Sequence, residues 1–214
     1  MRITGLKPAG RRPGFVSIDA GGVRMGVLPV EEIRALGVAV GQELDGRGEE
    51  RLLTALERVK AYDAAVRLLA VRGRAVQEMI VRLRRKGLRA DAVDHAVGRL
   101  ESEGLLDDAA FAREYARSLA GRGYGRARIL ADVSAKGVAR LVAERAVADV
   151  GEDDEEARRE KLLALAQKRV GRLRGLDRAV ARRRLVGYLA RRGYGGGEVW
   201  DVVRSVLGEI AEGE

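Results

Sequence analysis

The sequence contains no cysteine, which excludes disulfide bonds, thiolate metal sites and thiol nucleophiles. It has no apolar run approaching the roughly 18 residues that a membrane-spanning helix requires. Its N-terminus, Met1-Arg2-Ile3-Thr4, lacks the apolar core of a signal peptide. With a single histidine, His95, and no convergent polar motif, it offers no recognisable catalytic or metal-binding group. We therefore expect a cytoplasmic protein that is not an enzyme, needs no cofactor and does not enter a membrane.

Proline is absent after residue 29, and the segment that contains it differs from the rest. Residues 15–19 and 23–27 alternate apolar and polar side chains around Gly21-Gly22, which predicts a β-hairpin. Residues 36–44 are interpreted as a short apolar turn or strand. The first 48 residues therefore predict a small β-rich module of about three strands, which needs a packing partner because a hairpin alone is marginal in water.

From Glu49 onward the apolar residues recur with a helical period, and the helices themselves repeat. Helix-ending glycines stand at Gly87, Gly137 and Gly193, with intervals of 50 and 56 residues. Apolar residues precede them by eight positions (Met79, Ile129, Leu185) and by four (Leu83, Val133, Leu189), and follow them by ten (Val97, Val147, Val203). This pattern predicts three tandem three-helix repeats, 49–106, 107–151 and 152–214, which stack into an elongated curved rod.

Several shorter motifs have structural interpretations. Asp107 or Asp108 is expected to cap a helix rather than to act in catalysis, since no base or nucleophile accompanies the pair. Phe111, Tyr115 and Leu119 predict one apolar stripe, and Trp200 is expected in the core. The Arg-Gly-Tyr-Gly segments at 122–125 and 192–195 are interpreted as packed turns rather than nucleic-acid stacking platforms. His95 is interpreted as structural or exposed, and Glu152–Glu156 as acid at a helix start.

Basic residues exceed acidic ones only in the helical part of the chain. Residues 1–57 hold 8 basic and 8 acidic side chains, whereas residues 58–214 hold 33 and 24, so the net charge of +9 lies there. Between Arg158 and Arg192, 13 basic residues stand against two acidic ones. Such an excess indicates an anionic partner, either nucleic acid or an acidic protein surface. A solvated, arginine-rich surface explains the composition equally well.

Arginine clusters on the expected helices are the candidate partner-binding and nucleic-acid-binding residues. Arginine outnumbers lysine by 35 to 6, which favours planar, bidentate contacts. Three adjacent cations at 182–184 exceed what helix capping requires, so binding is the favoured interpretation there. For Lys86, Lys136 and Arg192, each before a helix-ending glycine, interaction with the helix dipole is favoured. The candidates are Arg82, Arg84, Arg85, Arg113, Arg117, Arg126, Arg128, Arg182, Arg183, Arg184 and Arg191.

One segment carries a family resemblance. It reads Gly104-Leu-Leu-Asp-Asp-x-x-Phe111-Ala-x-x-Tyr115, followed by Gly125, Ile129 and Lys136-Gly-Val138. Together with the repeats and with Ala61-Tyr62-Asp63, this segment resembles the RecX family of bacterial recombination regulators, over about residues 58–207. The family often has a serine where Ala75 stands, so the second helix is expected to begin without a side-chain cap.

The resemblance implies a non-catalytic protein that binds the RecA–single-stranded-DNA filament along its groove. Such proteins restrain filament growth, ATP hydrolysis and strand exchange in recombination, DNA repair and the SOS response. Single-stranded DNA, and duplex DNA as a further possibility, are expected to meet the basic surface of a monomer. The alternative is a RecA-independent duplex-DNA binder with helix-turn-helix-like repeats. Acidic residues at the starts of the would-be reading helices, 89–94 and 195–201, argue against it.

Overall fold

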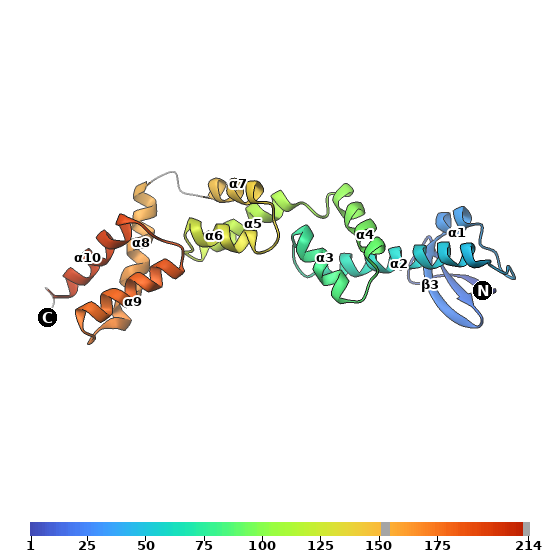
Figure 1. Ribbon diagram of the computed structural model, residues 1–214, viewed down its shortest axis with the longest axis horizontal. Coiled ribbons are helices and arrows are strands. Elements are labelled where there is room, and N and C mark those ends of the chain that lie inside the picture. Colours follow the sequence, from blue (N-terminus) through green and yellow to red (C-terminus); the bar gives the residue numbers. More distant parts are fainter. Residues whose placement is uncertain (151–154, 212–214) are drawn as a thin grey trace. The chain divides into compact units, whose positions relative to one another are not determined.

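The computed structural model describes residues 1–150 and 155–211. The chain forms two compact units, Met1–Asp107 and Asp108–Glu214. The first unit contains a small sheet and the helices up to α4, and the second contains the helices from α5 to α10 (Figure 1). The prediction of a mainly helical fold behind a small β-rich N-terminal module is confirmed.

The N-terminal sheet is antiparallel, with the order β1-β2-β3. Its strands are β1 (Ile3–Pro8), β2 (Phe15–Ala20) and β3 (Val23–Pro29). The turn between β2 and β3 consists of Gly21 and Gly22, whose φ angles of 56° and 81° are those that a tight hairpin turn requires. The hairpin expected from the alternating pattern is therefore present.

Strand β1, which completes the sheet, comes from a segment that the sequence pattern did not indicate as a strand. Ile3–Pro8 is too mixed in polarity to show a clear alternation, and it becomes a strand because β2 offers it a free edge. Residues 36–44, for which a strand was one interpretation, instead follow helix α1 (Val30–Leu36). They form an irregular segment that meets the N-terminus, where the amide of Ile3 donates to the carbonyl of Gln42 at 2.9 Å.

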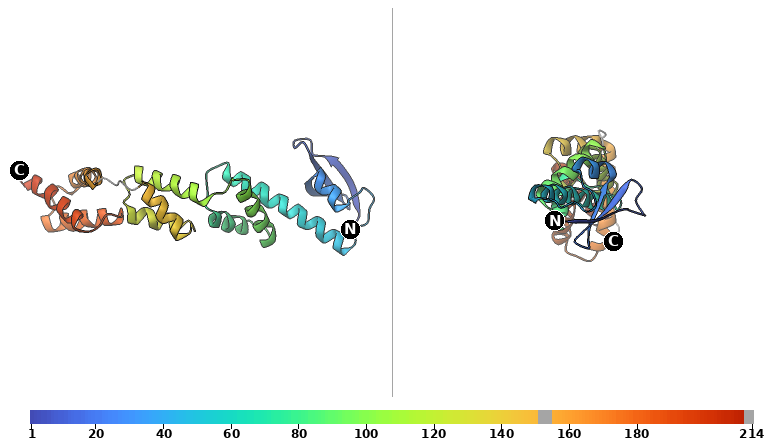
Figure 2. Two further views of the ribbon diagram at one scale, coloured as in Figure 1. Left: turned by 90° about the horizontal axis from the view of Figure 1, so that it is seen from above. Right: turned by 90° about the vertical axis from the view of Figure 1, so that its right-hand side faces the viewer.

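Helix α2 (Gly46–Leu69) links the sheet to the first three-helix repeat. Asp45 caps it by accepting a hydrogen bond from the amide of Gly48 at 2.7 Å. Its N-terminal part packs Leu52 against the buried Ile18 and Leu28 of the sheet. Figure 2 shows the ribbon of this helix beside the sheet. The hairpin thus gains the partner that it needs to be stable.

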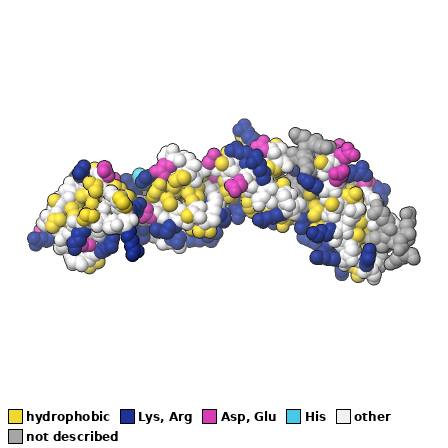
Figure 3. Space-filling model, turned by 180° about the vertical axis from the view of Figure 1, so that it is seen from behind, with side chains coloured by type: hydrophobic (Ala, Val, Ile, Leu, Met, Phe, Trp, Pro, Cys, Tyr) yellow, Lys and Arg dark blue, Asp and Glu magenta, His cyan; other side chains and the backbone are white. Residues whose placement is uncertain are grey.

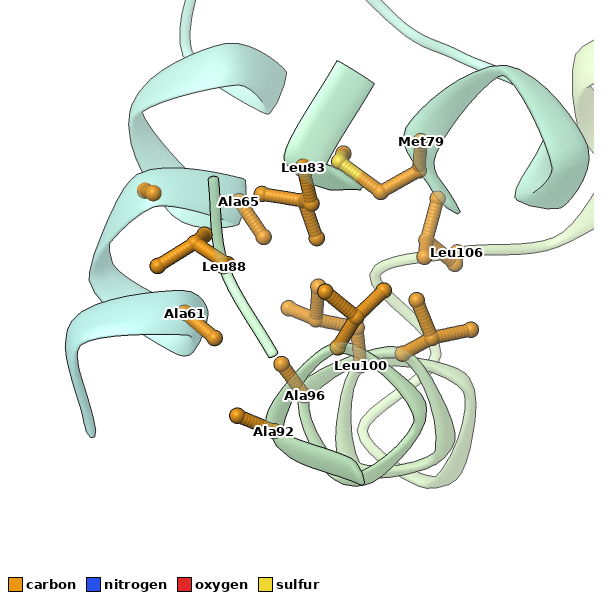
Figure 4. Packing of buried hydrophobic residues seen from close by; sticks show 12 residues of the cluster. Ala61, Ala65, Met79, Leu83, Leu88, Ala92, Ala96, Leu100 and Leu106 are labelled. Carbon is orange, nitrogen blue, oxygen red and sulfur yellow. The ribbon is translucent and has the colours of Figure 1, made fainter. Parts of the chain in front are cut away.

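The first repeat consists of the C-terminal part of α2 with α3 (Val76–Arg85) and α4 (Ala90–Ser102). Met79 and Leu83 of α3 point toward Leu100 of α4 and toward small side chains of α2 (Figure 4). Ala61 and Ala65 are fully buried, which lets α2 and α4 approach closely.

The second unit contains two more sets of three helices. The first set is α5 (Asp108–Gly121), α6 (Arg126–Ser134) and α7 (Arg140–Val150), and the second is α8 (Glu155–Val170), α9 (Arg178–Arg191) and α10 (Gly197–Ala211), with a 3₁₀ turn at Gly171–Leu173. The expected boundary between repeats at 151 and 152, and the first part of the acidic run Glu152–Glu156, lie outside the described residues.

Residues at matching positions of the three repeats are buried alike. The aligned apolar residues expose no more than 5% of their surface in any repeat: Met79, Ile129, Leu185; Leu83, Val133, Leu189; Val97, Val147, Val203. The aligned glycines all have positive φ: 76° at Gly87, 86° at Gly137 and 87° at Gly193. A left-handed residue ends the middle helix of each repeat, as the sequence pattern predicts.

Candidate functional site

Candidate arginines on α5 are exposed and unpaired. Arg113 and Arg117 lie one turn apart, while Ala112, Ala116 and Leu119 form the buried side of the helix. Among the described residues, neither guanidinium forms an ion pair or a hydrogen bond. Each therefore retains its full charge and its donors for an external anion.

Helix α9 presents the densest group of candidates. Arg182, Arg183 and Arg184 fan over its exposed half, because successive residues of an α-helix are about 100° apart. Arg191 is exposed at the end of the same helix. Within the part of the chain that the structure describes, none of these four has an ion-pair partner. Asp177 caps the start of the helix by accepting from the amides of Ala179 and Val180 at 2.9 and 3.2 Å.

The candidates on α3 and α6 are partly neutralised by their own helices. Arg82 pairs with Glu78 at 3.0 Å, and Arg128 pairs with Asp132 at 2.9 Å. Arg84 lies 3.7 Å from Asp94, a contact between two exposed side chains that contributes little. The remaining candidates on these helices, Arg85 and Arg126, are exposed and have no ion pair in the described residues.

A buried charge network at the start of α3 is absent from the sequence predictions. Arg74, which exposes only 6% of its surface, donates to Glu78 at 2.6 Å and to the carbonyl of Leu68 at 3.2 Å. Arg72 and Arg82 also donate to Glu78. Desolvation alone raises the pKa of Glu78, but the hydrogen bonds from the three arginines outweigh it and lower the pKa to about 2.

The same network explains how α3 begins. Ala75 occupies the N-cap position without a side-chain hydrogen bond, as expected from the missing serine. Glu78 stands three residues later, where an acidic side chain interacts favourably with the helix dipole. The sequence does contain a signal for this network, because Arg74, Glu78 and Arg82 are spaced four residues apart, as ion pairs along a helix are.

The two Arg-Gly-Tyr-Gly segments are turns that pack against each other. The segment at 122–125 joins α5 to α6, and the one at 192–195 joins α9 to α10. The amide of Gly125 donates to the carbonyl of Arg192 at 2.7 Å. The Arg192 guanidinium donates to the carbonyl of Arg122 at 2.8 Å and lies 5.2 Å from the ring centre of Tyr124. The Arg192 side chain therefore makes contacts with the neighbouring repeat in addition to the helix-dipole interaction that the sequence predicts.

Lys136 has a similar internal contact in the second repeat. Its ammonium lies 5.6 Å from the ring centre of Tyr115, and Tyr115 stacks on Phe111 at 5.6 Å. The expected apolar stripe thus divides: Leu119 is buried, while the two aromatic rings are half-buried. The prediction that Trp200 belongs to the core is wrong, because half of its surface is exposed at the edge of the apolar face of α10.

The described residues contain no group of three or more His, Asp or Glu side chains placed to hold a metal ion. Among the same residues, no helix combines the length and apolar character needed to cross a bilayer. On the side that Figure 3 shows, Lys and Arg side chains lie over both units, with hydrophobic and acidic side chains between them.

Comparison with known proteins identifies the repeats. Family models described as the first, second and third three-helix domains of RecX match residues 61–100, 107–147 and 154–203. A protein named regulatory protein RecX from Amycolatopsis mediterranei (strain U-32) is 37% identical over 151 residues, which cover 70% of this chain and 85% of that protein. Another of that name, from Streptomyces coelicolor, is 35% identical over 154 residues, or 72% and 80% of the two chains.

Solved structures show the same fold. A crystal structure of regulatory protein RecX superposes with a TM-score of 0.74 at 20% identity and covers 95% of this chain and 98% of that chain. The structure of RecX from Lactobacillus salivarius gives a TM-score of 0.59 at 21% identity and covers 70% and 96%. At these identities the likeness concerns the fold.

Proposed function

The chain belongs to the RecX family of regulatory proteins, and on that basis we propose that it binds the RecA–single-stranded-DNA filament along its groove. It acts without catalysis, in the cytoplasm and as a monomer, by restraining filament growth, ATP hydrolysis and strand exchange. The unpaired arginines of α5 and α9 are the observation that supports this proposal most strongly.

The binding energy has an electrostatic and a steric part. The arginine groups on α5 and α9 meet phosphates of single-stranded DNA or carboxylates of RecA, and bidentate guanidinium contacts suit both. The tandem repeats bridge successive RecA subunits along the groove. A chain bound in this way blocks the addition of RecA subunits and the approach of a second DNA strand.

Independent binding to duplex DNA is less well supported. The third helices of the first and third repeats, α4 and α10, would have to enter the major groove. The first five residues of these helices include Asp91 and Asp94 in α4, and Glu198 and Asp201 in α10. Asp94 and Asp201 expose 63% and 56% of their side chains, so they would repel the phosphates that flank the groove.

The direct experiment measures ATP hydrolysis by the RecA of the same host on single-stranded DNA while the full-length protein is added below one copy per RecA. Inhibition at substoichiometric ratios is expected, because one bound molecule affects growth of a whole filament. The triple variant R182A/R183A/R184A is expected to need at least tenfold more protein for half-inhibition. The matched control R140A/R145A/R204A removes three exposed arginines from α7 and α10 and should inhibit like the parent protein.

Two results would redirect the interpretation. Equal inhibition by both triple variants, with unchanged helicity, would remove Arg182–Arg184 from the interface. An absence of inhibition by the parent protein, together with tight and salt-sensitive binding to bare duplex, would instead support the RecA-independent alternative.

A further inference from the structure

A small pocket lies inside the first unit, where the N-terminal module meets the first repeat. Its volume is about 130 Å³. Phe15, Pro29 and Val59 form an apolar part of its wall, and Arg58, His95 and Arg99 line the polar part. We call this cavity the Arg58 pocket. It is separate from the arginines of α5 and α9, which belong to the other unit.

Two parallel rows of side chains bring the polar groups together. Arg58 and Tyr62 stand four residues apart on α2, and His95 and Arg99 stand four apart on α4, so each pair shares one helix face. The Arg99 guanidinium lies 4.2 Å from the ring centre of Tyr62. Arg58 and His95 each lie one turn before these residues on their helices, and the charge of Arg58 acts on His95.

Most charges around the pocket already have partners. Arg12, from the loop before β2, pairs with Asp63 through contacts of 2.5 and 2.8 Å, and Arg99 pairs with Glu103 at 2.7 Å. Arg58 is exposed and, among the described residues, forms neither an ion pair nor a hydrogen bond. Among the described charged residues that line the pocket, Arg58 and the carboxylate Glu32 are the two without an ion pair.

The charges around the pocket also act on the imidazole of His95. Burial, followed by the charges of Arg58 and Arg99, lowers the pKa of His95 below its ordinary value. Glu32 of α1, which also lines the pocket, acts in the opposite direction but does not cancel them. An anion in the pocket would relieve the repulsion.

We propose that the Arg58 pocket binds a phosphate group. Donors of Arg58 on α2 and of His95 and Arg99 on α4 line it, which suits an oxyanion. The volume admits a single phosphate group, and a nucleoside attached to that group would lie outside the pocket. The group comes either from free inorganic phosphate or from one phosphodiester of single-stranded DNA. RecA takes no part in this binding.

His95 provides the test, because it is the sole histidine and its imidazole signal in an NMR spectrum is unambiguous. Inorganic phosphate, or a short oligothymidine, is titrated into the full-length protein at constant ionic strength set with chloride. A saturable shift of the His95 signal is expected, together with a rise in the pKa of His95. The variant R58Q is expected to bind at least tenfold more weakly. The control R67Q removes one exposed arginine from the same helix, outside the pocket, and should behave like the parent protein.

The outcomes separate the sources of the phosphate. Saturation by inorganic phosphate alone identifies a free-anion site, and saturation by the oligonucleotide alone identifies a DNA backbone contact. An absence of saturable shift with both ligands, or equal binding by R58Q and R67Q, would overturn the proposal. Since the experiment contains no RecA, its failure would leave filament binding untouched.

Discussion

The amide of Gly125 and the carbonyl of Arg192, which belong to different three-helix repeats, form a hydrogen bond of 2.7 Å. Around this bond the two Arg-Gly-Tyr-Gly turns approach so closely that a Cβ atom on Gly193 would lie 2.4 Å from the backbone nitrogen of Arg128. The second unit is therefore joined by backbone contact in addition to side-chain packing. This junction can be tested separately from any binding activity.

The substitution G193A should destabilise the protein by about 3 kcal/mol. Alanine is disfavoured at the left-handed φ of this position, and its Cβ atom would clash with the backbone of Arg128. G87A, at the matching position of the first repeat, has a similar φ but open space around it and should cost only about 1 kcal/mol. Urea unfolding followed by circular dichroism compares them. Equal losses for the two variants would show that the turn contact contributes nothing.

Replacing Arg192 by lysine should also weaken the junction. The guanidinium donates to two carbonyls, of Arg122 and Gly123, and lies beside Tyr124, which an ammonium cannot reproduce in full. We expect R192K to lose about 1 kcal/mol of unfolding free energy. The neighbouring variant R191K changes an exposed residue without these contacts and should be neutral in the same thermal-unfolding measurement.

Glu78 should make stability depend on pH in the acid range. Its pKa is lowered to about 2 in the folded state, from about 4.5, so its ionised form stabilises the fold fully above about pH 4.5. That contribution is lost as pH falls from about 4.5 toward 2. At pH 7 the variant E78Q should be less stable by about 2 kcal/mol, and the difference should shrink below pH 4.

Unfolding of E78Q and of the parent protein between pH 7 and pH 3 measures this effect. E101Q, which removes an exposed carboxylate from α4, serves as the control and should leave stability nearly unchanged. A difference between E78Q and the parent protein that stays constant across this range would mean that the ionisation of Glu78 is not coupled to folding.

Removing the unpaired arginines of α5 should weaken DNA binding more than removing an arginine that already has an ion pair. R113A/R117A removes two free guanidinium groups, whereas R128A removes one that already pairs with Asp132. Binding of the full chain to single-stranded oligonucleotide should weaken severalfold in the first variant and little in the second. The slope of log K against log salt should fall by about 1.4 for the first, if each arginine meets one phosphate. An unchanged slope would indicate contact with protein groups only.

The sequence by itself determined the repeat. Positions such as Leu83, Val133 and Leu189 are buried alike because helical periodicity and a glycine with left-handed φ are local properties, which recur wherever the same short pattern recurs. The hairpin around Gly21-Gly22 follows from the same kind of local preference. Strand β1 does not, since its pairing depends on an edge that exists only once β2 has formed.

The tertiary structure alone decided which charged and aromatic side chains remain available to a partner. Arg191 and Arg192 are neighbours of the same kind in the sequence, yet Arg192 donates to the carbonyl of Arg122 in another repeat, whereas Arg191 is exposed and unpaired in the described residues. Trp200 looks like a core residue, yet the apolar face of α10 is complete without it. The Arg58 pocket joins segments distant in the sequence, so its charge balance has no local pattern. Pairing, exposure and enclosure depend on neighbours in space, and those neighbours are set by packing.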